Sequence, residues 1–376
     1  MAGIYIHIPF CKQACTYCNF HFSTSLAKKN DFLSSLKKEI SLNSDFISQE
    51  ECIDTIYFGG GTPSLLLPSE IDSILNAIQK KWLISSNAEI TLEANPDNID
   101  KKTLQSWHAN GINRLSVGIQ SFEEEELRWM NRAHSANQAV RCIHDIRESA
   151  IQNYSVDLIF GSPLLEDSQL KNNIKFIIEQ DIPHISCYAL TVEPKTALAA
   201  SISAQKKPNI DSEKQASQFL LISDWLCEAG YDHYEISNYA KPGKTSKHNS
   251  SYWEGKAYHG FGPSAHSFDG KNKRRWNIAN NSLYINNIIN NTQIFEEEEL
   301  STTAQINEHI MIGLRKKEGI NLNVMEIKFG ATIKEKLLHK LKKYIDTEKI
   351  IISNQEVQLT REGKLFADGI AADLFF

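Results

Sequence analysis

The sequence predicts an α/β fold built on a parallel sheet, because strand-like and helix-like runs alternate over its first 240 residues. The strand-like runs are residues 4–8, 53–58, 89–93, 115–120, 154–160 and 184–190, with a further candidate at 231–236. The helical patterns between them are residues 28–41, 68–82, 101–110, 137–150, 169–180 and 211–229. This alternation is typical of parallel strands joined by crossover helices, in which functional residues gather at the carboxyl ends of the strands.

Composition limits the class of protein. The chain has 376 residues, 41% of them hydrophobic and 23% charged, which suits one large domain and a smaller one. Its formal net charge of −6 argues against a general phosphate-binding surface, so nucleic acid is not an expected partner. No signal peptide precedes the first cysteines and no long uncharged apolar run could span a bilayer, so we expect a cytoplasmic protein.

Three cysteines follow the first strand-like run at CxxxCxxC spacing: Cys11, Cys15 and Cys18. Three thiolates on one short loop can hold three corners of an iron–sulfur cluster. A cubane [4Fe–4S] cluster has four irons, so one iron would be left without a protein thiolate and free to bind another ligand. This spacing favours a cluster with an open coordination position.

Two other interpretations of these cysteines stay open at this point. They could be three of four zinc ligands, with His7 or His21 as the fourth. They could also be buried thiols, which pack as small hydrophobic groups. A disulfide framework is disfavoured, because the chain has an odd number of cysteines, seven, and no secretion signal.

Other notable residues also fall at strand ends. Gly59–Gly61 follows the second strand, and polar side chains lie in or after the later strands, although solvated loops collect polar residues in any case. Glycines allow a ligand to approach the backbone closely, because they lack a Cβ atom. No GxGxxG follows a strand, so a dinucleotide-binding Rossmann unit is disfavoured.

The combination of CxxxCxxC, GGGTP and six strand–helix units resembles the radical S-adenosylmethionine (SAM) superfamily. The segments IYIHIPFC, FGGGTPS, NRLSVGIQSF, Asn131-Arg132 and VDLIFG are similar to the oxygen-independent coproporphyrinogen III oxidase group. This resemblance covers nearly the whole chain. It implies a partial, three-quarter TIM-like (β/α)6 barrel over residues 1–240, a connecting segment over 241–295 and a smaller α+β domain over 296–376.

The resemblance also implies site residues. Cys11, Cys15 and Cys18 would bind the [4Fe–4S] cluster, whose remaining iron would take S-adenosylmethionine. The cofactor contacts would be Tyr5, Tyr17, Gly60, Gly61, Thr62, Glu93, Gln120, Arg132, Asp157 and Ala189. In these positions Tyr17 could pack on the adenine ring, Arg132 could pair with the carboxylate, and Glu93 or Asp157 could accept hydrogen bonds from hydroxyl or amino groups.

One position departs from the oxidase pattern. The oxidases resemble CxxxCxxCxC, and Phe20 stands where their fourth cysteine would be. An HNxxYW motif from His248 to Trp253 further resembles the haem chaperone (HemW-type) branch of the group. Neutral imidazole is a common axial ligand of haem iron, which makes His248 a candidate, with His259 and His266 as alternatives.

The expected function is therefore a haem chaperone that passes haem to acceptor apoproteins. The alternative is an oxygen-independent coproporphyrinogen III oxidase, so whether the protein is an enzyme stays open, as do a homodimer and peripheral contact with membrane acceptor proteins. In the last part, residues 296–299 are expected to form a solvated acidic link. Helices at 303–314, 323–329 and 333–344, a hairpin of 350–352 with 357–359, and a final helix after residue 360 predict a winged-helix-like domain.

Overall fold

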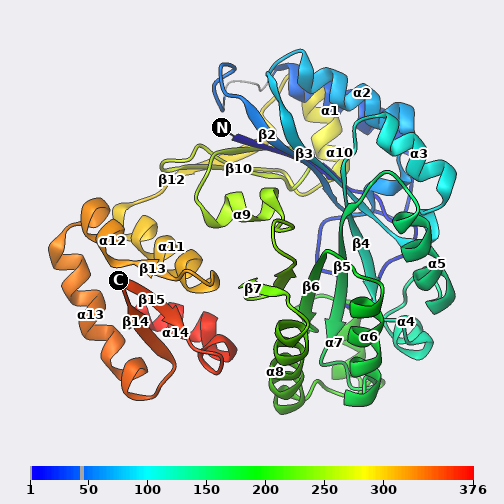
Figure 1. Cartoon of the computed structure of the whole chain (residues 1–376). Coiled ribbons are helices and arrows are strands. Elements are labelled where there is room, and N and C mark those ends of the chain that lie inside the picture. The colour runs from blue at the N-terminus through cyan, green and yellow to red at the C-terminus, as the bar shows by residue number, and fades with distance from the viewer. Residues whose placement is uncertain (1, 43–45) are drawn as a thin grey trace.

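The computed structural model, which describes residues 2–42 and 46–376, places one large sheet at the centre of the protein (Figure 1). Its twelve strands have the order β12-β11-β10-β9-β1-β2-β3-β4-β5-β6-β8-β7. The six expected strands form its parallel centre: β1 (Ala2–Ile8), β2 (Ile53–Gly60), β3 (Ile84–Ala94), β4 (Arg114–Gln120), β5 (Asn153–Phe160) and β6 (His184–Ala189). The predicted α/β class and parallel sheet are confirmed.

Crossover helices cover the outer face of this sheet. The six expected helices are α1 (Lys29–Leu42), α2 (Pro68–Gln79), α3 (Lys101–Ala109), α5 (Ala136–Arg147), α6 (Asp167–Glu179) and α8 (Ser212–Glu228). The sequence did not predict α4 (Glu124–Trp129) and α7 (Ala197–Ser203), which are short. Local signals set the helix starts. In α5, for example, the Ser135 side chain accepts a hydrogen bond from the Gln138 backbone amide, and the Gln138 side chain accepts one from the Ser135 amide in return.

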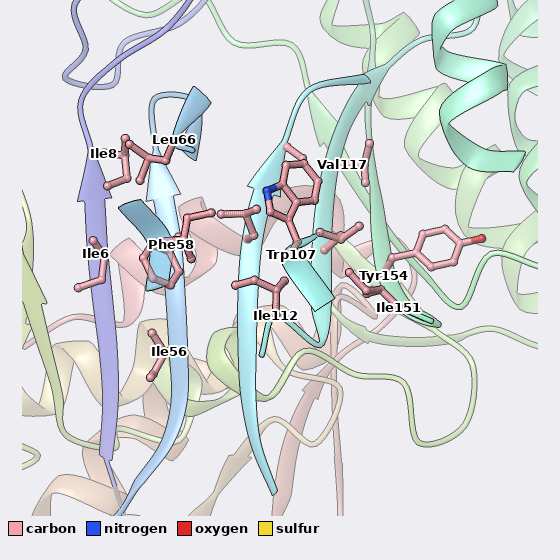
Figure 2. Packing of buried hydrophobic residues seen from close by; sticks show 14 of the residues in the cluster. Ile6, Ile8, Ile56, Phe58, Leu66, Trp107, Ile112, Val117, Ile151 and Tyr154 are labelled. Atoms are coloured by element: carbon pink, nitrogen blue, oxygen red, sulfur yellow. The ribbon is translucent and has the colours of Figure 1, made fainter. Parts of the chain in front are cut away.

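Apolar and polar residues alternate along each strand, which gives the sheet an apolar outer face and a polar inner face. In β1, Ile4, Ile6 and Ile8 are fully buried in the main core, whereas Tyr5 and His7 point to the opposite face. Figure 2 shows the outer layer, in which Ile6, Ile56 and Phe58 pack beside one another. The inner face is therefore free to carry the polar residues of a site.

Residues 241–299, expected to be a connecting segment and an acidic link, extend the sheet instead. They form α9 (Lys247–Trp253), β9 (Tyr258–Phe261), β10 (His266–Phe268), β11 (Lys273–Asn277), α10 (Asn281–Ile289) and β12 (Phe295–Glu299). The expected acidic link at 296–299 is wrong. Its glutamates lie opposite a basic strand, and Arg275 pairs with Glu297 at 3.1 Å, so opposite charges across two strands favour pairing. The domain division at 240 and 295 stays a prediction.

The C-terminal part is a small α+β domain, as expected. It contains α11 (Thr302–Arg315), β13 (Ile320–Asn321), α12 (Leu322–Phe329), α13 (Ala331–Asp346), β14 (Ile350–Ser353), β15 (Glu356–Leu359) and α14 (Ala367–Leu374). Its strands form a separate sheet in the order β13-β15-β14, and it has its own buried core.

This domain joins the two ends of the large sheet. It follows β12 in the chain, and beside β7 (Asp232–Glu235) and β8 (Asn238–Ala240) the Ile236 amide donates to the Arg315 carbonyl at 3.0 Å. Figure 1 shows the domain next to α9 and β7. It therefore closes off a space beside the sheet. In the described residues, no helix has the length and apolar character that crossing a bilayer requires.

Candidate functional site

Two cavities lie on the inner side of the sheet. The smaller has a volume of about 610 Å³ and the larger about 1260 Å³. The expected site residues that line the smaller one are Cys11, Cys15, Tyr17, Cys18, Gly60, Gly61, Thr62, Glu93, Gln120, Arg132, Asp157 and Ala189. Tyr5 lines the larger cavity, and His248 is in the lining of neither. The structure thus brings together nearly all residues that the resemblance implied.

The cysteines lie on the loop between β1 and α1, and neighbouring segments hold that loop in place. The Thr16 amide donates to the Met130 carbonyl at 3.1 Å, and Asn131 Nδ2 donates to the Ala14 carbonyl at 2.7 Å. Burial raises the pKa of the Cys11 thiol to about 11 and also raises that of Cys18. These thiols are therefore protonated at neutral pH without metal, and a metal or cluster would displace their protons on binding.

The donor arrangement bears on the choice between a cluster and zinc. Among the described residues, no three Cys, His, Asp or Glu side chains converge tightly enough to hold one metal ion. A single zinc ion needs its ligands to meet around one point, whereas a cubane spreads its thiolates over separate irons. His7 is also engaged elsewhere, since its Nε2 lies 2.9 Å from the His21 carbonyl oxygen. The loop fits a cluster better than a zinc ion.

The glycine run at the end of β2 has a packing role in addition to the expected one. A Cβ atom on Gly61 would lie 2.6 Å from the Phe10 carbonyl oxygen and 2.7 Å from that of Ile8, and one on Gly60 would meet the His7 ring at 2.5 Å. The Gly61 amide also donates to the Ile8 carbonyl at 2.9 Å. The absence of side chains therefore lets this loop pack against the segment that leads to Cys11, and does not only leave room for a ligand.

Arg132 connects the cysteine loop with the sheet. Its Nη1 lies 3.3 Å from both Cys15 Sγ and the Tyr17 hydroxyl, and its Nη2 donates to Asn95 Oδ1 and to the Gly118 carbonyl, each at 2.8 Å. A guanidinium held by four contacts is fixed in direction, and it places a positive charge beside the expected cluster.

Two carboxyl groups face the interior of the smaller cavity. Glu93 accepts hydrogen bonds from the Tyr57 hydroxyl at 2.8 Å and the Gly60 amide at 3.1 Å. Burial, with a smaller effect from Asp157, raises the pKa of Glu93 to about 7. Burial likewise raises the pKa of Asp157 to about 6, against hydrogen bonds from neighbouring serines. Both groups therefore change their protonation state near neutral pH, and their ionised forms would attract a cationic ligand.

Several inner residues of this site were not predicted from the sequence: Tyr57, Asn95, Ser116 and Ser186 line the same cavity. A signal for them exists, because each parallel strand alternates aliphatic with polar residues and the polar ones share the inner face. Gln120, which was expected, has a left-handed backbone with φ of 65°. That conformation is unfavourable for a residue other than glycine and is frequently found at functional sites.

His248 is enclosed by other side chains. It is 1% exposed, its Nδ1 lies 2.8 Å from Thr55 Oγ1, and its Nε2 lies 2.8 Å from the Tyr252 hydroxyl. Its ring also stacks on Tyr57 with ring centroids 4.9 Å apart. Both ring nitrogens are occupied and the side chain reaches neither cavity, so this arrangement does not favour His248 as an axial ligand of iron.

The two alternative histidines differ in access. His259 is 2% exposed and stacks on Phe261 with ring centroids 4.1 Å apart, away from both cavities. His266 is exposed and lines the larger cavity. Phe20, which occupies the position of the fourth oxidase cysteine, is 68% exposed and lines both cavities. An apolar ring of the cysteine loop therefore borders both cavities.

Comparisons with known proteins agree with this architecture. Residues 5–177 match the Radical SAM superfamily, and residues 300–366 match the HemN C-terminal domain. The chain is 32% identical to the heme chaperone HemW of Bacillus subtilis over 98% of each chain. It is 30% identical to heme chaperone HemW of Lactococcus lactis, over 96% of this chain and 93% of the relative. The structure of coproporphyrinogen III oxidase (HemN) from Escherichia coli is similar in fold, with a TM-score of 0.85 at 20% identity over 100% of this chain and 90% of that one.

Proposed function

Because the chain belongs to the radical SAM superfamily and, within it, to the family of the heme chaperone HemW, we propose that it binds haem and passes it to acceptor apoproteins. The observation that carries this proposal is the position of Phe20. Instead of a fourth thiol beside the cluster loop, the protein has an exposed apolar ring that lines the larger cavity. An apolar wall suits a bound macrocycle better than it suits radical chemistry at that position.

The smaller cavity is proposed to hold the two remaining cofactors. Cys11, Cys15 and Cys18 bind a [4Fe–4S] cluster, whose fourth iron takes S-adenosylmethionine. The cluster supplies one-electron chemistry to that cofactor when both are bound. Arg132 orients the loop and offers positive charge toward the cofactor carboxylate, while Glu93 and Asp157 receive its cationic part. Tyr17, Thr62, Gln120 and Ala189 complete the walls of this cavity.

The pKa values of the two carboxyl groups predict how cofactor binding depends on pH. Only the ionised carboxylates attract the cationic cofactor, so its affinity should rise as pH increases through 6 and 7. Below the pKa of each carboxyl group, binding must displace a proton, and the affinity falls by up to about tenfold for every unit by which the pH is lowered. Equilibrium binding to the anaerobically reconstituted protein between pH 5.5 and 7.5 measures this.

The variant Glu93→Gln is the matched control for this pH dependence. It keeps the size of the side chain and one of its two acceptor oxygens but cannot ionise, so the step near pH 7 should disappear. A wild-type affinity that does not change over this pH range would contradict the roles of both carboxyl groups.

The chaperone function is tested by haem transfer. The protein, reconstituted with its cluster and loaded with haem, is mixed with a haem-free acceptor such as an apo-cytochrome, and the acceptor's haem spectrum is followed. The proposal expects transfer that is faster than from free haem or from haem bound to albumin. Absence of haem binding, or transfer no faster than from these references, would overturn it. A cytoplasmic site of action is part of the same proposal.

A further inference from the structure

We propose that the haem lies in the larger cavity, between the sheet and the C-terminal domain, with His266 as a ligand of its iron. This inference rests on the haem-binding function proposed above and locates the binding site in the structure. The cavity, at about 1260 Å³, is twice as large as the one beside the cysteines. Its walls come from the cysteine loop, α9, β10, α11 and α12.

His266 is suited to ligation because its ring is accessible and because its stacking on Trp276, with ring centroids 6.4 Å apart, leaves the ring nitrogens open. It lies at the start of β10, and among the described residues no hydrogen bond engages its ring nitrogens. Partial burial and the neighbouring Arg274 lower its pKa, so the ring is neutral at physiological pH and keeps a lone pair for iron. His248 and His259 lack this access.

The cavity also presents apolar surface that a planar macrocycle would cover. Phe20, Met311 and Val324 are 68%, 38% and 37% exposed, and they come from the cysteine loop, α11 and α12. Leaving large apolar side chains in contact with water is unfavourable, and their grouping around one cavity from separate segments indicates a ligand site.

Positive charge is available for the two carboxylates of haem. Lys271, Lys316 and Lys328 line the cavity, and none of them forms an ion pair with another described residue. Of the four acidic residues of the same walls, Glu308 is paired with Arg274 at 2.6 Å and Glu254 with Lys256 at 2.6 Å. Glu356 accepts a hydrogen bond from Asn321 at 2.6 Å, and Glu318 forms no ion pair with another described residue. Free lysines at the rim of an apolar cavity match a ligand with an apolar body and carboxylate ends.

The test compares His266→Ala with His108→Ala in the full-length protein carrying its cluster. His108 is an exposed histidine on α3, which lies outside the cavity, and serves as the matched control. Titration with ferric haem should show affinity weakened at least about tenfold in His266→Ala, with a changed Soret band, and no change in His108→Ala. Free imidazole should restore the wild-type band to His266→Ala, because it can fill the vacated coordination position.

A second variant tests the location of haem in the larger cavity independently of the residue that binds its iron. The double substitution Lys316→Glu and Lys328→Glu should lower haem affinity while leaving the Soret band of the bound haem unchanged. Wild-type affinity and spectrum in His266→Ala would overturn the proposed ligand, and unchanged affinity in the double variant would overturn the cavity. Failure of the wild-type protein to bind haem would instead overturn the proposed function, so the two failures are distinguishable.

Discussion

Replacing Cys11, Cys15 or Cys18 by alanine is expected to abolish the iron–sulfur absorbance of the reconstituted protein. The loop supplies three thiolates, and a cluster that already lacks a fourth protein ligand has none to spare. Iron and sulfide content together with the visible absorbance near the cluster band measure the effect, which should be complete for each of the three variants.

The control for these variants is Cys227→Ala, which removes an exposed cysteine at the end of α8, away from the loop. It should assemble a full cluster. A [4Fe–4S] complement retained by any one loop variant, or stoichiometric zinc in the reconstituted wild-type protein, would refute the cluster assignment.

The second large effect is expected from Gly61→Val. A Cβ atom here would lie 2.6 to 2.8 Å from main-chain atoms of Ile8 and Phe10, which cannot move aside without shifting β1 or the start of the cysteine loop. Overpacking of this kind typically costs about 1–3 kcal/mol, and the displaced loop should also assemble less cluster. The midpoint of thermal or denaturant unfolding and the iron content measure both consequences.

Gly369→Val provides the comparison, because a Cβ atom at Gly369 in α14 would meet no other atom within 4 Å. Its unfolding midpoint and iron content should stay close to those of the wild-type protein. If Gly61→Val were as stable as Gly369→Val and bound the cofactor more weakly, the glycine would serve the ligand and not the packing of the loop.

Local patterns made much of the fold predictable. The alternation of aliphatic runs and amphipathic helical segments located the six parallel strands and their crossover helices, because burial between helices requires that pattern. The same periodicity explains why Glu93 and Asp157 face one cavity. The CxxxCxxC loop was recognisable because its ligands are close in sequence.

Long-range contacts explain what the sequence did not reveal. The glutamates of β12 looked like a solvated link, since the basic strand that pairs with them lies more than twenty residues earlier. His248 looked like a haem ligand, but Thr55 and Tyr252 occupy its two ring nitrogens and Tyr57 stacks on the ring. These residues come from a distant strand and from its own helix. The larger cavity depends on the position of the C-terminal domain, which no local pattern records.

The central claim is tested most directly by measuring both candidate activities on two portions of one protein preparation. The reconstituted protein receives S-adenosylmethionine, a reductant and coproporphyrinogen III, while a second portion receives haem and an apo-acceptor, with an authentic oxidase as the positive control. We expect haem to be bound and transferred and no coproporphyrinogen to be decarboxylated, because Phe20 replaces the fourth cysteine of the oxidase pattern. Conversion of coproporphyrinogen at a rate comparable to that of the oxidase, without transfer of haem, would contradict the account.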